Sequence, residues 1–220
     1  SSARGQGSLL ANPTARVREK EPNISSELYR QLARAYGEEP SLEDIFHYIY
    51  AVLYAPSYRE KYQEFLKIDF PRVPFTGDYN LFQKLAALGE KLVILHLLKS
   101  PELDTPIAKF HGAGNGIVAA KRRYDAETGH VWVNDSQYFD GIAPAVWEYM
   151  IGGYQVLDKW LKDRKDRRLT AEDIKHYCRI VTAIAKTIEL QKEIGALYPS
   201  VEKTPINTPP SKSSTTAATK

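Results

Sequence analysis

The chain has 220 residues, 43% of them hydrophobic and 11% aromatic, which is enough apolar material for one domain with a full core. Its formal net charge of +3 excludes the strongly basic composition that by itself indicates a nucleic-acid binder, so a DNA site would need local clusters of Lys and Arg. The single cysteine excludes an internal disulfide, and no apolar run is long enough for a signal peptide or a membrane span, so we expect a cytoplasmic protein without a membrane partner.

Two helices are predicted near the start of the chain. The first begins at Asn23 or Ser25, both good N-cap residues, and stops at Gly37, which readily takes the left-handed conformation of a helix C-cap. The second begins at Ser41 and Asp44, a pair that resembles a capping box, and its apolar residues recur with helical spacing. Each helix should bury one face.

A short third helix and a long fourth one follow. Ser57 opens the third helix. Asp78 caps the fourth, in which leucines keep helical spacing for about twenty residues, and Pro101 lies beyond its end. We expect this fourth helix to be the central helix of the core.

The pattern changes after residue 110 from helical spacing to short apolar runs broken by glycines. Residues 117–124 and 130–133 predict a β-hairpin around the turn DAETG. Residues 146–151 are mostly β-branched or aromatic and predict a third strand that stops at Gly152. Together the three strands would form a small antiparallel sheet.

Two further helices are predicted after the glycines. One starts near Tyr154 and leads into a basic segment, since residues 158–168 hold six Lys or Arg and three Asp. Thr170 and Asp173 then resemble a second capping box, and apolar residues at helical spacing extend the last helix for about twenty-five residues. Cys178 falls on the apolar stripe of that helix and should be buried.

The predicted fold class is α+β, a mostly helical domain with a small antiparallel sheet made of a β-hairpin and one further strand. Residues 1–22 lack periodicity and predict a linker or lead-in, and residues 23–202 form the domain. Residues 203–220 have too little apolar content to offset the entropy of ordering, so we expect a disordered tail. The missing initiator methionine and the polar start favour a fragment of a longer protein.

Two basic clusters are candidate DNA-binding sites. The first cluster, residues 121–123, lies on a predicted strand, where side-chain alternation sends at least one Arg to each face. The second cluster, residues 162–168, follows a helix packed on the body. Taken alone, each cluster is explained about as well by a solvated strand edge or helix end. Between them lie polar side chains, Asp135 among them, that suit base edges or phosphates. The candidate DNA-binding residues are Lys121, Arg122, Arg123, Asn134, Gln137, Tyr138, Lys162, Arg164, Lys165, Arg167 and Arg168.

Other chemistries have little support in the sequence. Gly112, Gly114 and Gly116 form GAGNG, but a dinucleotide site needs a preceding strand and a different third glycine, which leaves a flexible loop that approaches DNA or a plain connection. Asp163 and Asp173 each precede a Lys by two residues, as nuclease carboxylates can, yet both fall on predicted helices or helix ends. No histidine spacing indicates a metal site.

Three segments carry a family resemblance: FHYIYAVLYAPSYREKYQEFLKIDFPRVPF at residues 46–75, VWVNDSQYFDGI at 131–142 and IGGYQVLDKWLKDRK at 151–165. In this order they resemble the C-terminal specificity domain of type ISP restriction-modification enzymes and of related single-chain type IIG enzymes. The likeness covers residues 23–198.

The resemblance implies recognition of a target in double-stranded DNA on behalf of a methyltransferase domain of the same chain. It implies a small sheet placed in the major groove on a helical support. It also implies a parent enzyme that methylates adenine with S-adenosylmethionine and cleaves unmodified DNA with Mg and ATP, through nuclease and helicase domains elsewhere. This fragment itself would hold no catalytic residue, cofactor or metal.

These expectations divide the candidate residues by role. Arg122, Arg123, Asn134 and Gln137 lie on or beside the predicted hairpin and should read bases, whereas the basic residues of 162–168 should hold the DNA backbone. Two other functions stay open: a helical scaffold that braces neighbouring domains with little DNA contact, and an unrecognised nuclease.

Overall fold

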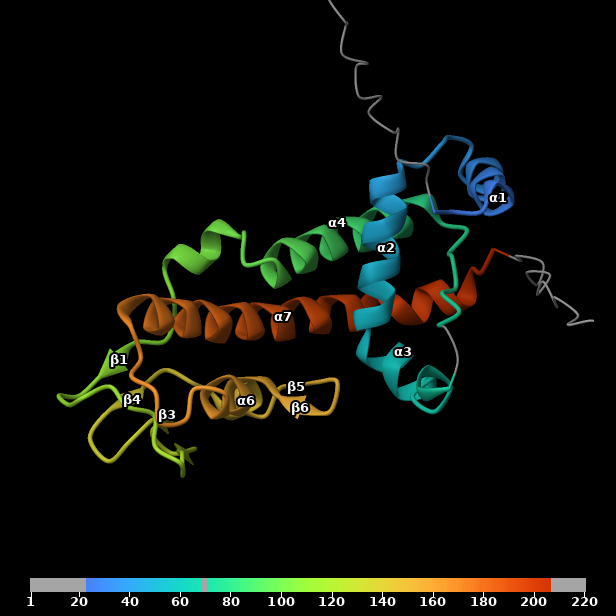
Figure 1. The fold of residues 1–220 in the computed structure, drawn as a ribbon. Coiled ribbons are helices and arrows are strands. Elements are labelled where there is room, and N and C mark those ends of the chain that lie inside the picture. Colours follow the sequence, from blue (N-terminus) through green and yellow to red (C-terminus); the bar gives the residue numbers. More distant parts are fainter. Residues whose placement is uncertain (1–22, 69–70, 207–220) are drawn as a thin grey trace, which may run out of the picture.

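A computed structural model describes residues 23–68 and 71–206 of the chain (Figure 1). The structure is 54% helical with short antiparallel strands, which confirms the predicted α+β class. The predicted linker 1–22 and residues 207–220 of the predicted tail lie outside the described residues. None of the described helices is long and apolar enough to cross a membrane.

The described helices are α1 (Ser26–Tyr36), α2 (Leu42–Tyr54), α3 (Pro56–Lys61), α4 (Tyr79–His96), α5 (Pro144–Trp147), α6 (Val156–Lys162) and α7 (Ala171–Lys203), with 3-10 turns η1 (Phe65–Lys67) and η2 (Pro101–Asp104). The strands are β1 (Phe110–His111), β2 (Arg123–Asp125), β3 (His130–Trp132), β4 (Tyr138–Phe139), β5 (Met150–Ile151) and β6 (Tyr154–Gln155).

The long helices start where the sequence predicts. The side chains of Ser25, Ser41 and Asp78 each accept a hydrogen bond from a backbone N–H in the first turn of their helix. Thr170 and Asp173 form a complete capping box at the start of α7. These bonds satisfy backbone donors that the helices leave free, and so they fix the helix starts.

The α1–α4 half of the molecule has a hydrophobic core of its own, to which the second half of α7 contributes. We call residues 24–68, 71–98 and 190–206 the helical lobe. Within it α2 and α4 pack so closely that Gly89 has no room for a side chain, because an added Cβ would lie 2.6 Å from the carbonyl carbon of His47 and closer still to its oxygen. The lobe is therefore a tightly packed support.

A second core joins a four-stranded antiparallel sheet to α5, α6 and the first half of α7. We call residues 107–188 the sheet lobe. The strand order is β1-β4-β3-β2, and Val131 and Phe139 are buried on the inner face, where the Phe139 ring lies 4.2 Å from that of Tyr177 in α7. In Figure 1 the sheet, α6 and the β5–β6 hairpin lie on one side of α7 and α4 lies on the other.

The predicted third strand at residues 146–151 is wrong. Pro144 starts the short helix α5, because proline at the first helical position already has a helical φ. Only β5 is extended there, and it pairs with β6 in a separate two-stranded hairpin. The predicted hairpin around DAETG exists, but its first strand begins at Arg123 rather than at residue 117. β1 and β4 complete the sheet, and two-residue strands are too short to show a period.

The helix α7, rather than α4, is the element that both cores share. It has 33 residues, more than predicted, and continues through Pro199 to Lys203. Beyond it, Pro205 pairs with Thr76 and the N–H of Ile206 donates to the carbonyl of Phe75 at 2.8 Å. The expected disordered tail therefore begins too early in the prediction, since residues 203–206 pack on the helical lobe.

Candidate nucleic-acid interface

The outer face of the four-stranded sheet carries a continuous row of rings and one cation. The Tyr138 ring lies between two histidines, with its centroid 4.2 Å from that of His130 and 5.5 Å from that of His111. Trp132 packs beside Tyr138 at 4.6 Å, and the guanidinium of Arg123 lies 5.0 Å from the Trp132 ring centroid. Because these rings cover one another's faces, the row suits hydrogen bonding through ring edges better than stacking on bases.

The two arginines of the first cluster point to opposite sides, as predicted, although only Arg123 lies within β2. Arg123 points outward from β2, whereas Arg122 turns inward and its side chain is only 10% exposed. The Arg122 Nε donates to Asp158 Oδ1 at 2.8 Å, and its Nη1 donates to the carbonyl of Ala120 at 3.0 Å. DNA contact by Arg122 stays an untested prediction, but this geometry favours a structural role in tying the strand to α6.

Asn134 and Gln137 are engaged with their own loop. The Asn134 Oδ1 accepts from the N–H groups of Ser136 and Gln137, and its Nδ2 donates to the carbonyl of Ile117 and to Gln137 Oε1. Gln137 is buried, and its Oε1 also accepts from the N–H of Gly116 at 2.7 Å. Base reading by these two residues is untested, and their bonds favour a role in shaping the turn before β4.

The glycine-rich loop 112–116 packs against that same turn. A Cβ at Gly112 would lie 3.0 Å from the Cα of Gln137, and one at Gly114 would lie 2.7 Å from the Gln137 Oε1. Gly112 and Gly116 also have positive φ angles. Of the two alternatives left by the sequence, this favours a plain connection, in which the glycines permit close packing of the backbone.

The fold brings the two basic clusters to one border of the sheet lobe. Residues 165–169 run beside residues 116–118, where the N–H of Val118 donates to the carbonyl of Arg167 at 3.0 Å and that of Asp166 donates to the carbonyl of Val118 at 2.9 Å. Lys121 follows Val118 by three residues, which is at most about 11 Å of chain. The backbones of the two clusters therefore lie close together.

The cations of the second cluster, residues 162–168, which we call the basic run, differ in whether neighbouring groups engage them. The Arg164 guanidinium lies 3.5 Å from the Trp160 ring centroid, and its Nε donates to Asp173 Oδ1 at 3.2 Å. Lys165 lies 3.6 Å from the carboxylate of its neighbour Asp166. No described residue forms an ion pair with the exposed side chains of Lys162, Arg167 and Arg168. Arg164 thus anchors the run, and the others are open to phosphate.

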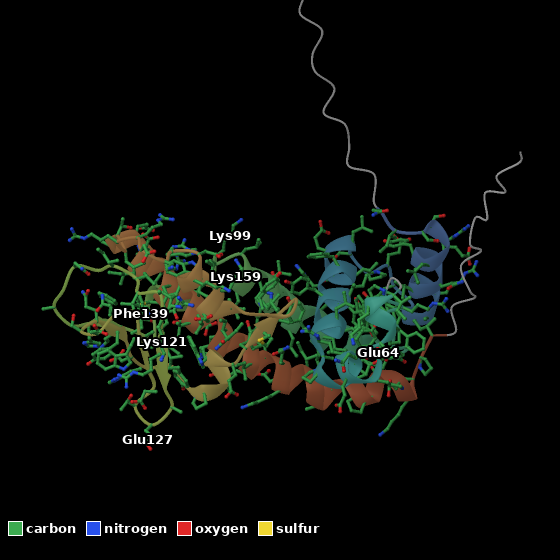
Figure 2. The ribbon with its side chains drawn as sticks, turned by 60° about the horizontal axis from the view of Figure 1, so that its bottom comes forward. Glu64, Lys99, Lys121, Glu127, Phe139 and Lys159 are labelled. Atoms are coloured by element: carbon green, nitrogen blue, oxygen red, sulfur yellow. The ribbon has the colours of Figure 1, made fainter. Side chains whose placement is uncertain are left out.

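The tip of the β2–β3 hairpin is acidic. Asp125 accepts hydrogen bonds from the backbone N–H groups of Thr128 and Glu127, and the bond from Thr128 contributes most to lowering the pKa of Asp125. Glu127 is exposed and points away from the body, while Lys121 and Phe139 lie closer to it (Figure 2). Negative charge at the tip opposes its entry between phosphates, so the outer sheet face and the basic run are the better candidate surface.

The two aspartates considered for nuclease chemistry are engaged in helix contacts. Asp163 pairs with Lys159 within one helical turn, and Asp173 caps α7, where the N–H of Thr170 lowers the pKa of Asp173. Burial raises the pKa of the Cys178 thiol to about 11, which keeps it protonated near neutral pH. Among the described residues, no group of three or more His, Cys, Asp or Glu is arranged to hold a metal ion.

The family model described as the type ISP C-terminal specificity domain matches residues 3–193. The chain belongs to this family. A search of curated proteins gives no match. The match includes both lobes, so the type ISP specificity domain comprises the helical support as well as the sheet.

Solved structures contain the same fold. A DrdV–DNA complex determined by cryo-electron microscopy is similar at 26% identity and a TM-score of 0.59, over 79% of this chain and 20% of that one. A nuclease-deletion mutant of the type ISP enzyme LlaGI with a DNA substrate mimic matches at 21% identity and a TM-score of 0.53, over 71% of this chain and 14% of that one. The ATP-dependent type ISP enzyme LlaBIII bound to DNA matches at 18% identity and a TM-score of 0.57, over 78% of this chain and 12% of that one. The matched part of this chain thus spans at most a fifth of the length of each of these chains.

Proposed function

We propose that this chain recognises a specific sequence in double-stranded DNA for a restriction-modification enzyme. The observation that carries the proposal is its membership of the specificity-domain family, together with its likeness to a domain of DrdV, which was solved with DNA. The exposed cations beside an outward row of polar rings supply a surface of suitable chemistry.

The two parts of this surface have different roles. Lys162, Lys165, Arg167 and Arg168 contact phosphates and position the DNA, because their side chains are exposed. Lys162 ends α6, and the other three project from a segment hydrogen-bonded to residues 116–118. The outer sheet face, through Arg123 and Tyr138, meets the base edges in the major groove. Compared with the roles expected from sequence, base reading moves from Arg122, Asn134 and Gln137 to side chains that face outward.

The remaining activities belong to other parts of a longer enzyme in this proposal. A methyltransferase domain of the same chain would transfer a methyl group from S-adenosylmethionine to adenine. Nuclease and helicase domains would use Mg and ATP. To the residues that the structure describes we assign recognition of the DNA target.

A bracing role for the helical lobe is compatible with this function. Every candidate DNA-binding residue lies in the sheet lobe, while α1–α4 pack around a separate core. The hypothesis of a bracing scaffold therefore applies to the helical lobe alone. If the whole chain bound no DNA, the hypothesis would apply to both lobes.

The isolated chain should bind DNA weakly, with an affinity that falls steeply as salt rises, because phosphate contacts release counterions. Lys165→Ala or Arg167→Ala should weaken binding to all sequences alike and reduce the slope of log affinity against log salt by about one. Gel shifts or fluorescence anisotropy at several salt concentrations would measure this. Failure to bind even at low salt would contradict the proposal.

Replacing Asp166 by Asn should strengthen binding to any DNA by about two- to fivefold at low salt, since it removes a negative charge beside Lys165. Asn suits this position because Asp166 has a φ of 60°, a conformation that Asn tolerates well. The matched control is Glu64→Gln, which removes the same charge in the helical lobe (Figure 2). Equal effects of both changes would mean that overall charge, not the basic run, controls binding.

A further inference from the structure

The β5–β6 hairpin presents an apolar tip that the protein itself does not cover. Met150, Ile151 and Tyr154 are 50%, 47% and 62% exposed. They flank Gly152 and Gly153, which both have positive φ, and a Cβ on either glycine would meet no atom within 4 Å. The tip therefore projects into open space as a narrow, preformed ribbon.

The register of the hairpin places its apolar groups at the end of the ribbon. Ile151 pairs with Tyr154 next to the turn, and Met150 pairs with Gln155 one step behind. The Gln155 side chain turns back to donate to the carbonyl of Trp147, which fixes the base of the hairpin on α5. The ribbon thus holds Ile151 and Tyr154 at its tip, and exposed Met150 lies one step behind them, opposite the hydrogen-bonded Gln155.

Positive charge accompanies this hairpin along α6. The Lys159 Nζ lies 5.9 Å from the Tyr154 ring centroid, and Lys162 ends the helix at the start of the basic run. Nearby carboxylates are partly engaged, since Asp158 pairs with Arg122 and Asp163 with Lys159, while Glu148 at the base of the hairpin is exposed. The hairpin and the basic run are joined by α6, which is about 10 Å long, a length over which a duplex carries about six phosphate charges.

The exposed area favours DNA over a protein partner. Three side chains, each about half exposed, offer about 300 Å² of apolar surface, whereas a stable protein interface needs about 800 Å² from each partner. Insertion into a DNA base step needs only one or two apolar side chains. In Figure 1 the hairpin, α6 and the sheet all lie on the side of α7 opposite α4.

We propose that the β5–β6 hairpin is a wedge that enters the minor groove of bound DNA and partly unstacks a base step with Ile151, while Met150 packs in the groove one step behind it. This rests on the proposed DNA-binding function and adds a deformation of the duplex to it. Tyr154 lies against the sugar-phosphate wall of the groove beside Lys159. The basic run holds the flanking phosphates, so the duplex bends around the sheet lobe.

The test compares the 220-residue chain with a Met150→Ser/Ile151→Ser variant on a short duplex that carries fluorophores at both ends. The original chain should bring the ends closer by bending the DNA by about 20 to 90°. The variant should lose this change and bind about tenfold more weakly, because two apolar side chains no longer leave water. Its salt slope should stay unchanged, since no phosphate contact is removed.

Leu97→Ser is the matched control, because Leu97 is an exposed apolar residue, at 58%, in the helical lobe. It should leave affinity and bending as they were. If the original chain binds DNA but the hairpin variant binds and bends it equally well, the wedge is overturned and the proposed function stands. If the original chain binds no DNA at any salt concentration, both fail. A self-association that only the hairpin variant loses would assign the tip to a protein contact and overturn the wedge.

Discussion

Gly89→Ala should destabilise the protein by about 3 kcal/mol or more and lower its melting temperature by about 6 to 12 °C. The new methyl group would meet the backbone of His47, where α4 packs closely on α2, and a backbone cannot rotate away as a side chain can. Helix propensity alone predicts the opposite, because alanine favours a helix interior by about 1 kcal/mol over glycine. Thermal unfolding followed by circular dichroism would measure the sign as well as the size.

Gly195→Ala provides the matched comparison. This glycine is also helical, in α7, but a Cβ there would lie 3.5 Å from the Cδ of Pro56, an ordinary contact. Its replacement should be neutral or stabilising by up to about 1 kcal/mol. Similar melting temperatures for the two variants would mean that α2 and α4 are further apart in solution.

Arg122→Ala should cost about 2 kcal/mol of stability and leave the DNA target unchanged. The change leaves Asp158 without its cation and removes a donor from the carbonyl of Ala120. Removing one partner of a fully buried pair costs more, but the Asp158 side chain is one-third exposed, so water compensates in part. Urea unfolding of Arg122→Ala, Asp158→Ala and the double variant would give the coupling energy, which should exceed about 0.5 kcal/mol.

Arg123→Ala is the complementary change on the next residue. It should leave unfolding within about 0.5 kcal/mol of the original, because Arg123 is exposed. In an enzyme that carries this domain, it should relax the target at one position, with a cost of about 1 to 3 kcal/mol for the base that it contacts. Methylation-site sequencing would reveal this. A changed target in Arg122→Ala and an unchanged one in Arg123→Ala would reverse the assignment.

The helices were predictable because their signals are local. Ser41, Asp78 and Thr170 each act within three residues, and the leucines of α4 repeat every turn. The strands were less predictable, since β1 and β4 have two residues each and β1 pairs only with β4, far along the chain. Apolar and aromatic residues at 146–151 favoured a strand, but Pro144 set the local conformation.

The candidate interface was predictable as a region and not residue by residue. Both basic clusters and the alternation at Arg122 and Arg123 follow from the sequence. Arg122 turns inward to pair with Asp158, which is 36 residues away. The buried side chain of Gln137 accepts a hydrogen bond from the N–H of Gly116, 21 residues away. Nothing in the local pattern distinguishes a polar side chain that packs at such a distance from one that faces solvent. The histidines beside Tyr138 gave no signal because they are separated in sequence and meet only across strands.

The shared helix α7 also determines how the protein should come apart. About 50 Å long, it contributes Tyr177 and Val181 to one core and Ile194 and Val201 to the other. Neither lobe can lose its packing without exposing part of the same helix. Amide protons in the middle of α7 should therefore exchange with solvent only through global unfolding, and calorimetry should record one transition for both lobes.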